Sequence, residues 1–301
     1  MISSTARISI NCKFDRGAAQ VPREQGVISS SESATEPQLV EFPMTLTVVT
    51  VCRNAESTIA DALRSVAEQD FPDIEHIVID GASTDSTCSV VRANLTRVRR
   101  FVSEPDRGIY DAMNKGISWA TGEFTCFLNA DDLYASEGTL SSLVSVLRAE
   151  GVDAVHADLR YVAREDVTRT IRRWRGRPFQ PGLFARSWAP AHPTFLARTA
   201  LLRDAGGFDL RYRLAADFDL MLRLLEIRSA SSAYAPIDAV RMRIGGATGA
   251  SIGSIVRQNR EILDSLRRHG MRASVPEFLL RKAMARIGQR FDAVSRADGR
   301  D

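Results

Sequence analysis

The clearest chemical signature in this chain of 301 residues is a pair of adjacent carboxylates, Asp131 and Asp132. They follow Asn129 and an apolar run, so the sequence predicts them at the end of a buried strand. Two neighbouring negative charges are unfavourable there unless water or a cation takes up their charge. A hard divalent ion such as Mg²⁺ or Mn²⁺ accepts these oxygen ligands and leaves positions open for phosphate oxygens. A solvated acidic turn is the alternative for the pair taken alone.

A third carboxylate, Asp80, ends the apolar run IVID and precedes Gly81. At a strand end its side chain can face a crevice and accept hydrogen bonds from a base or a ribose. Capping of the next helix is its alternative role, for which Asp85 is better placed. Asn54 and Glu56 follow the first apolar run and are candidates for the same pocket. For these two, a purely structural role at the start of a helix is an equal alternative.

The stretch 103–116 is dense in polar groups for a segment that leads into a helix. Arg107 and Lys115 are candidates to meet a diphosphate, which arginine binds through its planar fork. Asp111 and Asn114 have an equally good structural role in fixing this turn against its neighbours.

Two further candidates lie later in the chain. Asp217 opens an apolar helix. A hydroxyl that attacks as a nucleophile needs a base within hydrogen-bond reach, and the carboxylate of Asp217 is a candidate for that base. A carboxylate on a rigid helix start can be aimed in this way, although capping of the helix is the alternative. His192 lies between prolines, and its neutral imidazole could complete a metal shell. A loop histidine bonded to a backbone carbonyl is the alternative for this residue.

Strands and helices that alternate along residues 45–150 must position these side chains. Apolar β-branched runs predict strands, and helical spacing of apolar residues predicts the segments between them. The predicted strands are 45–52, 74–80, 101–105 and 123–129, and the predicted helices are 56–69, 85–94, 109–120 and the one around 140–147. This alternation predicts an α/β fold with a mostly parallel sheet flanked by helices. Ligands of such sheets gather beyond the carboxyl ends of the strands, where the polar residues converge.

Composition bounds the class of protein. The chain is 44% apolar and 26% charged with a net charge of +3, which is ordinary for a globular protein and does not indicate nucleic-acid binding. Its four cysteines form no CxxC, which favours a reducing compartment over disulfides or zinc. No apolar run reaches membrane-spanning length, and no signal peptide is apparent, so we expect a cytoplasmic protein. Residues 1–44 are expected to form a mobile tail.

Five segments spread in order over about residues 45–248 resemble family 2 glycosyltransferases of the GT-A fold. The likeness is closest to the bacterial branch that builds exopolysaccharides, O-antigens and glycolipids. The segments read VVTVCRNAEST, VIDGASTDST, SEPDRGIYDAMNKGISWATGEFTCFLNADDLY, HPTFLAR and GGFDLRYRLAADFDLMLRL. Arg53 departs from the family pattern, where an aromatic residue is common, and Ala216 stands where many relatives carry a second acid.

The resemblance implies an inverting transfer of a sugar from a nucleotide-diphosphate sugar to an acceptor hydroxyl. It implies that Asp80 binds the base, that Asp131 and Asp132 hold the ribose and a Mn²⁺ or Mg²⁺ ion, and that Asp217 is the catalytic base. It favours the interpretation of His192 as a metal ligand. The implied acceptor is a saccharide or a lipid-linked molecule used in surface polysaccharide or glycolipid synthesis.

Other functions fit the residues less well. A sugar nucleotidyltransferase would carry a glycine- and arginine-rich phosphate loop after its first strand, and VCRNAEST is not one. A dinucleotide oxidoreductase would need GxGxxG there. A glycosidase would separate its paired carboxylates across the bond it cleaves. A non-catalytic nucleotide-sugar-binding protein stays open, although the presence of both Asp132 and Asp217 favours an enzyme.

The C-terminal extension, residues 251–301, is predicted to form two basic helices broken near Gly270 and Pro276. Leu279, Ala283, Ile287 and Phe291 form an apolar stripe in the second helix, beside many arginines. Such a helix can hold a peripheral protein on anionic lipid, here the inner face of the plasma membrane. Packing on the catalytic domain (45–250) or on a second copy of the chain is the equal alternative.

Overall fold

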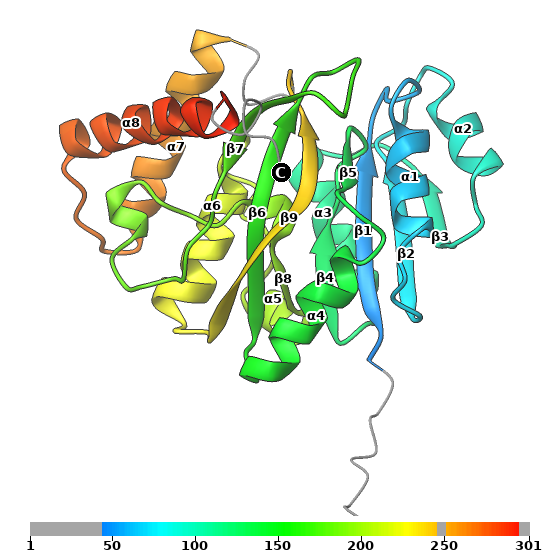
Figure 1. The fold of residues 1–301 in the computed structure, drawn as a ribbon, viewed down its shortest axis with the longest axis horizontal. Coiled ribbons are helices and arrows are strands. Elements are labelled where there is room, and N and C mark those ends of the chain that lie inside the picture. The colour runs from blue at the N-terminus through cyan, green and yellow to red at the C-terminus, as the bar shows by residue number, and fades with distance from the viewer. Residues whose placement is uncertain (1–43, 246–250, 295–301) are drawn as a thin grey trace, which may run out of the picture. The chain divides into compact units, whose positions relative to one another are not determined.

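The computed structural model describes residues 44–245 and 251–294, all within one compact unit that begins at Pro43. Strands at its core form a nine-stranded sheet with the order β3-β2-β1-β4-β8-β6-β9-β5, and β7 pairs with β6 (Figure 1). The first half is parallel, as predicted. It consists of β1 (Leu46–Cys52), β2 (Ile74–Asp80), β3 (Val98–Ser103) and β4 (Phe124–Phe127).

The second half of the sheet is mixed. Here β8 (Leu196–Arg198) runs antiparallel to both β4 and β6 (Ala154–Val162), whereas β9 (Ser232–Arg243) runs parallel to β6. The short strand β5 (Asp132–Tyr134) and the edge strand β7 (Thr170–Trp174) pair antiparallel to β9 and β6. These short strands of the second half were not individually predicted.

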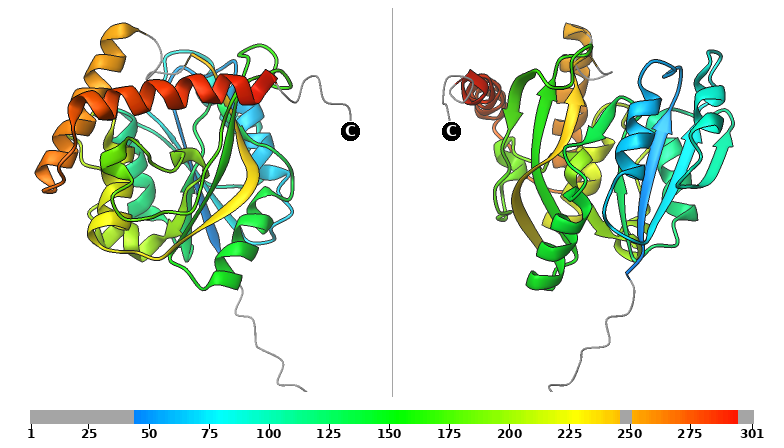
Figure 2. Two further views of the ribbon diagram at one scale, coloured as in Figure 1. Left: turned by 60° about the vertical axis from the view of Figure 1, so that its left-hand side comes forward. Right: turned by 45° about the vertical axis from the view of Figure 1, so that its right-hand side comes forward.

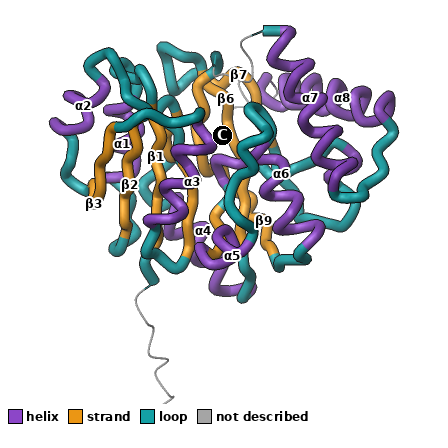
Figure 3. The backbone as a smooth tube through the Cα atoms, turned by 180° about the vertical axis from the view of Figure 1, so that it is seen from behind, coloured by secondary structure: helices purple, strands orange, loops and turns teal. Residues whose placement is uncertain are grey.

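Helices cover both faces of the sheet because its central strands are apolar on both sides. Leu46 and Val48 share a core with α1 (Ile59–Ala67) and α4 (Thr139–Glu150). Val49 and Val51 point to the opposite core, shared with α3 (Ile109–Trp119), α5 (Thr199–Asp204) and α6 (Ala216–Leu222). Figure 3 shows this second set of helices from behind. The small helix α2 (Thr87–Ala93) adds Val91 to a third cluster with Val78 and Ile59.

Two C-terminal helices complete the unit, α7 (Ile252–Arg268) and α8 (Val275–Val294). Figure 2 shows α8 lying across the end of β6 and β7, and α8 packs against β7. Phe278 of α8 is fully buried, as is Leu266 of α7. One side of these helices therefore packs on the rest of the unit.

Several predicted boundaries move. The helix predicted over 56–69 is shorter and begins at Ile59. Residues 53–58 instead form the β1–α1 loop, which is bonded to the β2–α2 loop. The helix predicted from Ala216 continues as a π turn over Arg223–Ile227. The break predicted near Gly270 and Pro276 is confirmed: α7 ends at Arg268, and Pro276 lies in the first turn of α8, where its missing N–H costs no helical hydrogen bond. The predicted tail lies outside the described residues, apart from Met44.

Candidate active site at the carboxyl ends of the parallel strands

Asp80 lies at the centre of the strand ends, in register with Cys52 of β1 and Ser103 of β3. Its carboxylate is fully buried and accepts hydrogen bonds from Ser103 Oγ (2.6 Å), Ser83 N (2.9 Å) and Cys88 Sγ (3.2 Å). Burial acts to raise the pKa of Asp80, but the hydrogen bonds from Ser103 and Ser83 outweigh it and lower the pKa. Asp80 is therefore an ionised group that organises the turn after β2.

Asn54 and Glu56 join the β1–α1 loop to the β2–α2 loop. Asn54 has a left-handed backbone (φ 50°), and its Oδ1 accepts from Thr84 N at 2.9 Å. Glu56 Oε2 accepts from Ser86 N (2.8 Å), while Glu56 N donates to Asp85 Oδ2 (3.2 Å). Both side chains thus have a structural role, in joining the β1–α1 loop to the turn that follows Asp80.

The two predicted phosphate-binding cations have acidic partners of their own. Arg107 is exposed and pairs with Asp111 at 2.9 Å, which raises the pKa of the guanidinium. Lys115 pairs with Glu104 at 2.7 Å and donates to the carbonyl of Pro105. A phosphate would have to compete with these carboxylates for either cation.

The two carboxylates after β4 differ in their burial. Asp131 is partly exposed, whereas Asp132 is fully buried in β5. Burial and the neighbouring charge of Asp131 raise the pKa of Asp132 well above its ordinary value. Asp132 Oδ2 accepts from Asn129 Nδ2 (3.2 Å), but Asp132 Oδ1 and Asn129 Oδ1 are buried without a partner among the described residues. Two orphaned oxygens beside a carboxylate pair fit a hard cation, which would supply the missing positive charge.

Arg243 is a residue of this corner that the sequence analysis missed. Its buried guanidinium donates to the carbonyl of Asp131 (3.0 Å) and pairs with Asp61 at 2.5 Å. It therefore fixes the backbone of the acidic turn from β9, far away in sequence. Only the pairing of β5 with β9 brings it there.

Asp217 lies in the first turn of α6 and is not its cap. The cap position is Ala215, without a side-chain hydrogen bond. Asp217 Oδ1 instead accepts from Tyr110 Oη (3.1 Å), and its carboxylate stays partly exposed. Burial, followed by the charge of Asp217, raises the pKa of Tyr110 well above its ordinary value, so the phenol remains a donor. Tyr110 is a second site residue that the sequence analysis left without a role.

Asp219, two residues later, has a different function. Its buried carboxylate pairs with Arg223 (2.7 Å) and accepts from Ser265 Oγ (2.7 Å) and His269 Nε2 (3.1 Å) of the C-terminal region. It anchors α7 to α6.

His192 lies in an aromatic cluster. Its ring packs against Phe127 (5.3 Å between centroids) and Phe208 (5.5 Å), and Phe208 stacks on Tyr110 (5.3 Å). Burial lowers the pKa of His192, and the charge of Asp217 opposes this. Its Nε2 is buried without a partner. Across the described part of the chain, no three His, Cys, Asp or Glu side chains come together as a metal-binding group.

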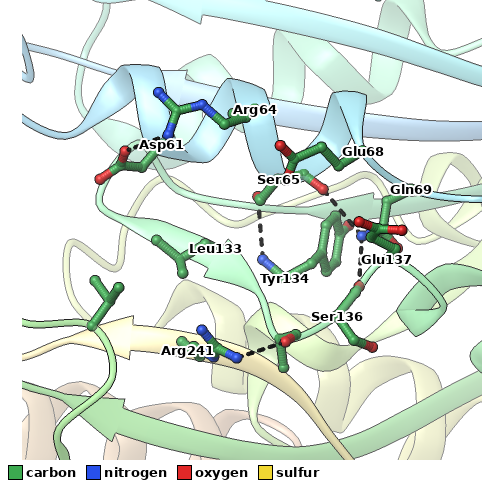
Figure 4. Close-up of a pocket in the computed structure, with 12 residues that line it drawn as sticks. Asp61, Arg64, Ser65, Glu68, Gln69, Leu133, Tyr134, Ser136, Glu137 and Arg241 are labelled. Atoms are coloured by element: carbon green, nitrogen blue, oxygen red, sulfur yellow. Dashed lines mark hydrogen bonds and ion pairs between the residues drawn. The ribbon is translucent and has the colours of Figure 1, made fainter.

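The charges of Asp132 and Asp217 act on the same tyrosine. Both carboxylates act to raise the pKa of Tyr161 on β6, which burial already raises and Arg172 lowers. Tyr161 is therefore within electrostatic reach of Asp132 of β5 and of Asp217 of α6. The surface pocket of about 270 Å³ shown in Figure 4 is elsewhere: α1, β5 and Arg241 line it, and none of the predicted site residues does.

Comparison with known proteins identifies the family of the chain. The model of the family "Glycosyl transferase family 2" matches residues 47–205, and the chain belongs to this family. A Mycobacterium tuberculosis PGL/p-HBAD biosynthesis glycosyltransferase is 33% identical over 175 residues, which cover 56% of this chain and 65% of that protein. The chain thus spans slightly less than two thirds of that relative. An uncharacterized glycosyltransferase of the same organism is 31% identical over 184 residues, covering 60% of this chain and 68% of its own length.

Solved structures show the GT-A fold. Staphylococcus aureus TarS 1–349 in complex with UDP-GlcNAc matches with a TM-score of 0.59 and 20% identity, over 79% of this chain and 72% of that one. The mannosyltransferase PcManGT of Pyrobaculum calidifontis, in complex with GDP-Man and Mn²⁺, matches with a TM-score of 0.59 and 21% identity, over 87% and 77% of the two chains. The predicted family and fold are therefore confirmed.

Proposed function

We propose that this protein is a metal-dependent, inverting glycosyltransferase that moves a sugar from a nucleotide-diphosphate sugar to an acceptor hydroxyl, with Asp217 as the base. The observation that carries the proposal is the state of Asp217. It is a partly exposed carboxylate in the first turn of a helix. It accepts a hydrogen bond from Tyr110 and does not cap the helix. The matched family and the nucleotide sugars bound to TarS and PcManGT support a donor of this class.

Donor binding is assigned to the strand-end crevice. Asp131 is proposed to bind the ribose. Asp80 is proposed to bind the nucleobase, with a donor of the base replacing one of its present hydrogen-bond donors. Asn54 and Glu56 would shape the edge of the donor site through the loops they join. The diphosphate would be bound by Arg107 and Lys115. Asp132 is proposed as the ligand of a Mn²⁺ or Mg²⁺ ion, with Asn129 Oδ1 beside it and His192 Nε2 as a further ligand. A bound ion supplies charge neutralisation of the leaving diphosphate.

The chemical step needs few groups. Asp217 takes the proton of the acceptor hydroxyl while that oxygen bonds to the anomeric carbon. The bond from this carbon to the diphosphate oxygen breaks at the same time, and its electron pair leaves with the diphosphate. Attack from the opposite face inverts the carbon, so an α-linked donor gives a β-linked product. Tyr110 holds Asp217 Oδ1 and leaves Oδ2 to face the acceptor.

The acceptor is proposed to be a saccharide or a lipid-linked molecule at an anionic membrane surface. None of the described helices is both long and apolar enough to cross a bilayer. The outward side of α8, however, exposes Leu280 (60%), Met284 (63%) and Ile287 (57%). Exposed basic groups lie nearby on both helices, at Arg267, Arg268 and Arg281. An apolar stripe flanked by cations fits the surface of an anionic membrane.

A panel assay tests the proposed function. Full-length protein is incubated with UDP- and GDP-sugars, with Mn²⁺ or with EDTA, and released nucleoside diphosphate is measured. We expect one donor to be hydrolysed slowly, and faster when a mixture of oligosaccharide and lipid-linked acceptors is added. Release of pyrophosphate from sugar phosphate and nucleoside triphosphate would instead identify a nucleotidyltransferase. Binding of a donor without turnover under any condition would identify a non-catalytic binding protein.

A further inference from the structure

The acidic turn after β4, residues 129–132, is closed by its own hydrogen bonds. Asp132 N donates to the carbonyl of Asn129 (3.0 Å), and Asn129 Nδ2 donates to Asp132 Oδ2 (3.2 Å). The turn is also fixed to β1, because Ala130 N donates to the carbonyl of Val51 (3.3 Å). The two orphaned oxygens of Asn129 and Asp132 therefore belong to one closed turn, and its shape decides how they can meet a cation.

Arg243 of β9 bonds to the same turn from a distant part of the chain. Its Nη1 donates to the carbonyl of Asp131 (3.0 Å), its Nη2 pairs with Asp61 Oδ2 of α1 (2.5 Å), and its Nε donates to the carbonyl of Arg164 in the β6–β7 loop (3.2 Å). All three nitrogens of the guanidinium are therefore engaged, each by a different segment. Because the guanidinium is planar and rigid, these three contacts fix its position and with it that of the Asp131 carbonyl.

The burial of Arg243 argues for a role in the site rather than in stability alone. Arg243 is 5% exposed, whereas the side chain of Asp61 keeps 40% of its surface exposed. The desolvation of a buried ion pair can cancel its Coulomb gain, so such a pair is weak evidence of a stabilising role. What distinguishes this pair is its third member, the carbonyl of the acidic turn.

Arg241, which precedes Arg243 on the same strand, provides an internal comparison. It lies opposite Leu133 of β5, and its Nη2 donates to the carbonyl of Ala135 (2.9 Å). It therefore also bonds to the backbone of this connection, but at the other end of β5 from Asp132. Of the two arginines, only Arg243 bonds to the acidic turn.

We propose that Arg243, oriented by Asp61, is a positioning residue of the donor site, which holds the turn 129–132 in the shape that binds the divalent ion. Arg243 acts through the backbone of Asp131 and touches neither the ion nor the nucleotide. Groups that orient metal ligands commonly account for about 10- to 100-fold in metal affinity. The inference rests on the proposed function, because Asp132 is assigned there as the metal ligand.

Calorimetry of UDP and GDP binding to the full-length protein, with Mn²⁺ and with EDTA, tests this role. Arg243→Gln removes the charge and the planar fork together, whereas Arg243→Lys removes the fork and keeps the charge. Asp61→Asn removes the charged partner that orients the fork. The matched control is Arg241→Gln, on the same strand and with a backbone partner of its own.

We expect Arg243→Gln to lower the Mn²⁺-dependent affinity by about tenfold or more, and Arg243→Lys to lower it nearly as much. Asp61→Asn should lower it less, because the bonds of Arg243 to Asp131 and Arg164 remain. The control should keep the wild-type affinity. An unchanged Arg243→Gln would overturn the proposal. Wild-type affinity in Arg243→Lys would overturn it as well, because charge alone would then be sufficient.

The double variant Asp61→Asn/Arg243→Gln tests whether Asp61 acts through Arg243. In that case the double variant loses no more affinity than Arg243→Gln alone, because the second change has nothing left to orient. Additive losses would overturn the role of Asp61. Melting curves show which variants are folded, and Arg243→Lys carries the comparison if Arg243→Gln is not.

Hydrogen–deuterium exchange of the metal-free protein provides a measurement that needs no ligand. The amide of Asp132 is bonded within the turn, so we expect it to exchange faster in Arg243→Gln than in Arg241→Gln. Equal exchange in the two variants would show that Arg243 does not hold the turn. Failure of the proposed metal site is seen separately, as wild-type diphosphate binding that EDTA leaves unchanged. That result would remove the predicted effect on affinity, while exchange would still decide whether Arg243 positions the turn.

Discussion

Tyr110 donates a 3.1 Å hydrogen bond to Asp217 across a sequence separation of 107 residues. It joins the first turn of α3, which follows β3, to the first turn of α6, which lies between β8 and β9 along the chain. The stacking of Tyr110 on Phe208 holds the phenol in place, and Phe208 in turn contacts Phe127 and His192. The proposed base is thus oriented by a residue of α3, which packs on the parallel strands β1 and β2.

Replacement of Asp217 by Asn tests the base. The variant keeps the size of the side chain and removes its basicity, so we expect transfer to fall by about 10²–10⁴. Donor affinity and melting temperature should stay close to wild type, because Asp217 is assigned to the acceptor. A folded variant that transfers sugar at the wild-type rate would show that another group is the base. Tyr110→Phe, which removes the orienting hydrogen bond alone, should lose activity more mildly.

Replacement of Asp219 by Ala should have the opposite profile. It leaves Arg223 without its buried partner and frees Ser265 and His269. Loss of one member of a buried ion pair costs about 3–5 kcal/mol of unfolding free energy. Urea unfolding measures this, and a change below 1 kcal/mol would show that α7 is held by its apolar contacts alone.

The metal assignment predicts that UDP or GDP binds weakly in EDTA. The clustered carboxylates otherwise repel the diphosphate. Calorimetry with and without Mn²⁺ measures the difference, and Asp132→Asn should reduce it. His192→Ala should do so more mildly. Diphosphate affinity that EDTA leaves unchanged would contradict the assignment of Asp132.

The outer side of α8 is predicted to bind anionic lipid. Truncation near residue 250 would remove the buried Phe278 and Leu266 and is therefore a poor test. Replacement of Leu280, Met284 and Ile287 by Ser instead removes the exposed apolar groups. We expect the triple variant to sediment several-fold less with anionic vesicles at low salt than wild type does. If both bind equally weakly and only the wild type dimerises, this side is a contact between two copies of the chain.

The stability of the fold should fall in mild acid because of His76. This histidine is fully buried on β2 against Thr50 (2.9 Å), and burial lowers its pKa from 6.5 to about 3. Below about pH 6.5 His76 therefore binds a proton in the unfolded chain but not in the folded chain. The contribution of His76 to stability is lost as the pH falls below this value. The slope approaches about 1.4 kcal/mol per pH unit. His76→Gln should unfold with a shallower pH dependence between pH 6 and 5, and parallel curves would contradict this.

The sequence by itself determined the parallel half of the fold and the order of its polar strand ends. The runs at 45–52 and 74–80 are continuous and β-branched, which only a strand buried on both faces can use. Local chemistry of this kind also identified Asp80, Asp132 and Asp217 as candidates, because each follows or opens a periodic segment.

Only the tertiary structure decided what these candidates contact. Whether Asp217 caps its helix or faces the crevice depends on Tyr110, and whether Asp131 is held depends on Arg243, each more than 100 residues away. The short strands β5 and β8 carry too few residues for a period of their own, and pairing with β9, β4 and β6 defines them. Lys282 is the clearest case. Its helical spacing gives a basic surface residue, but packing of α8 half-buries its side chain, and its Nζ donates to Asn259 Oδ1 of α7.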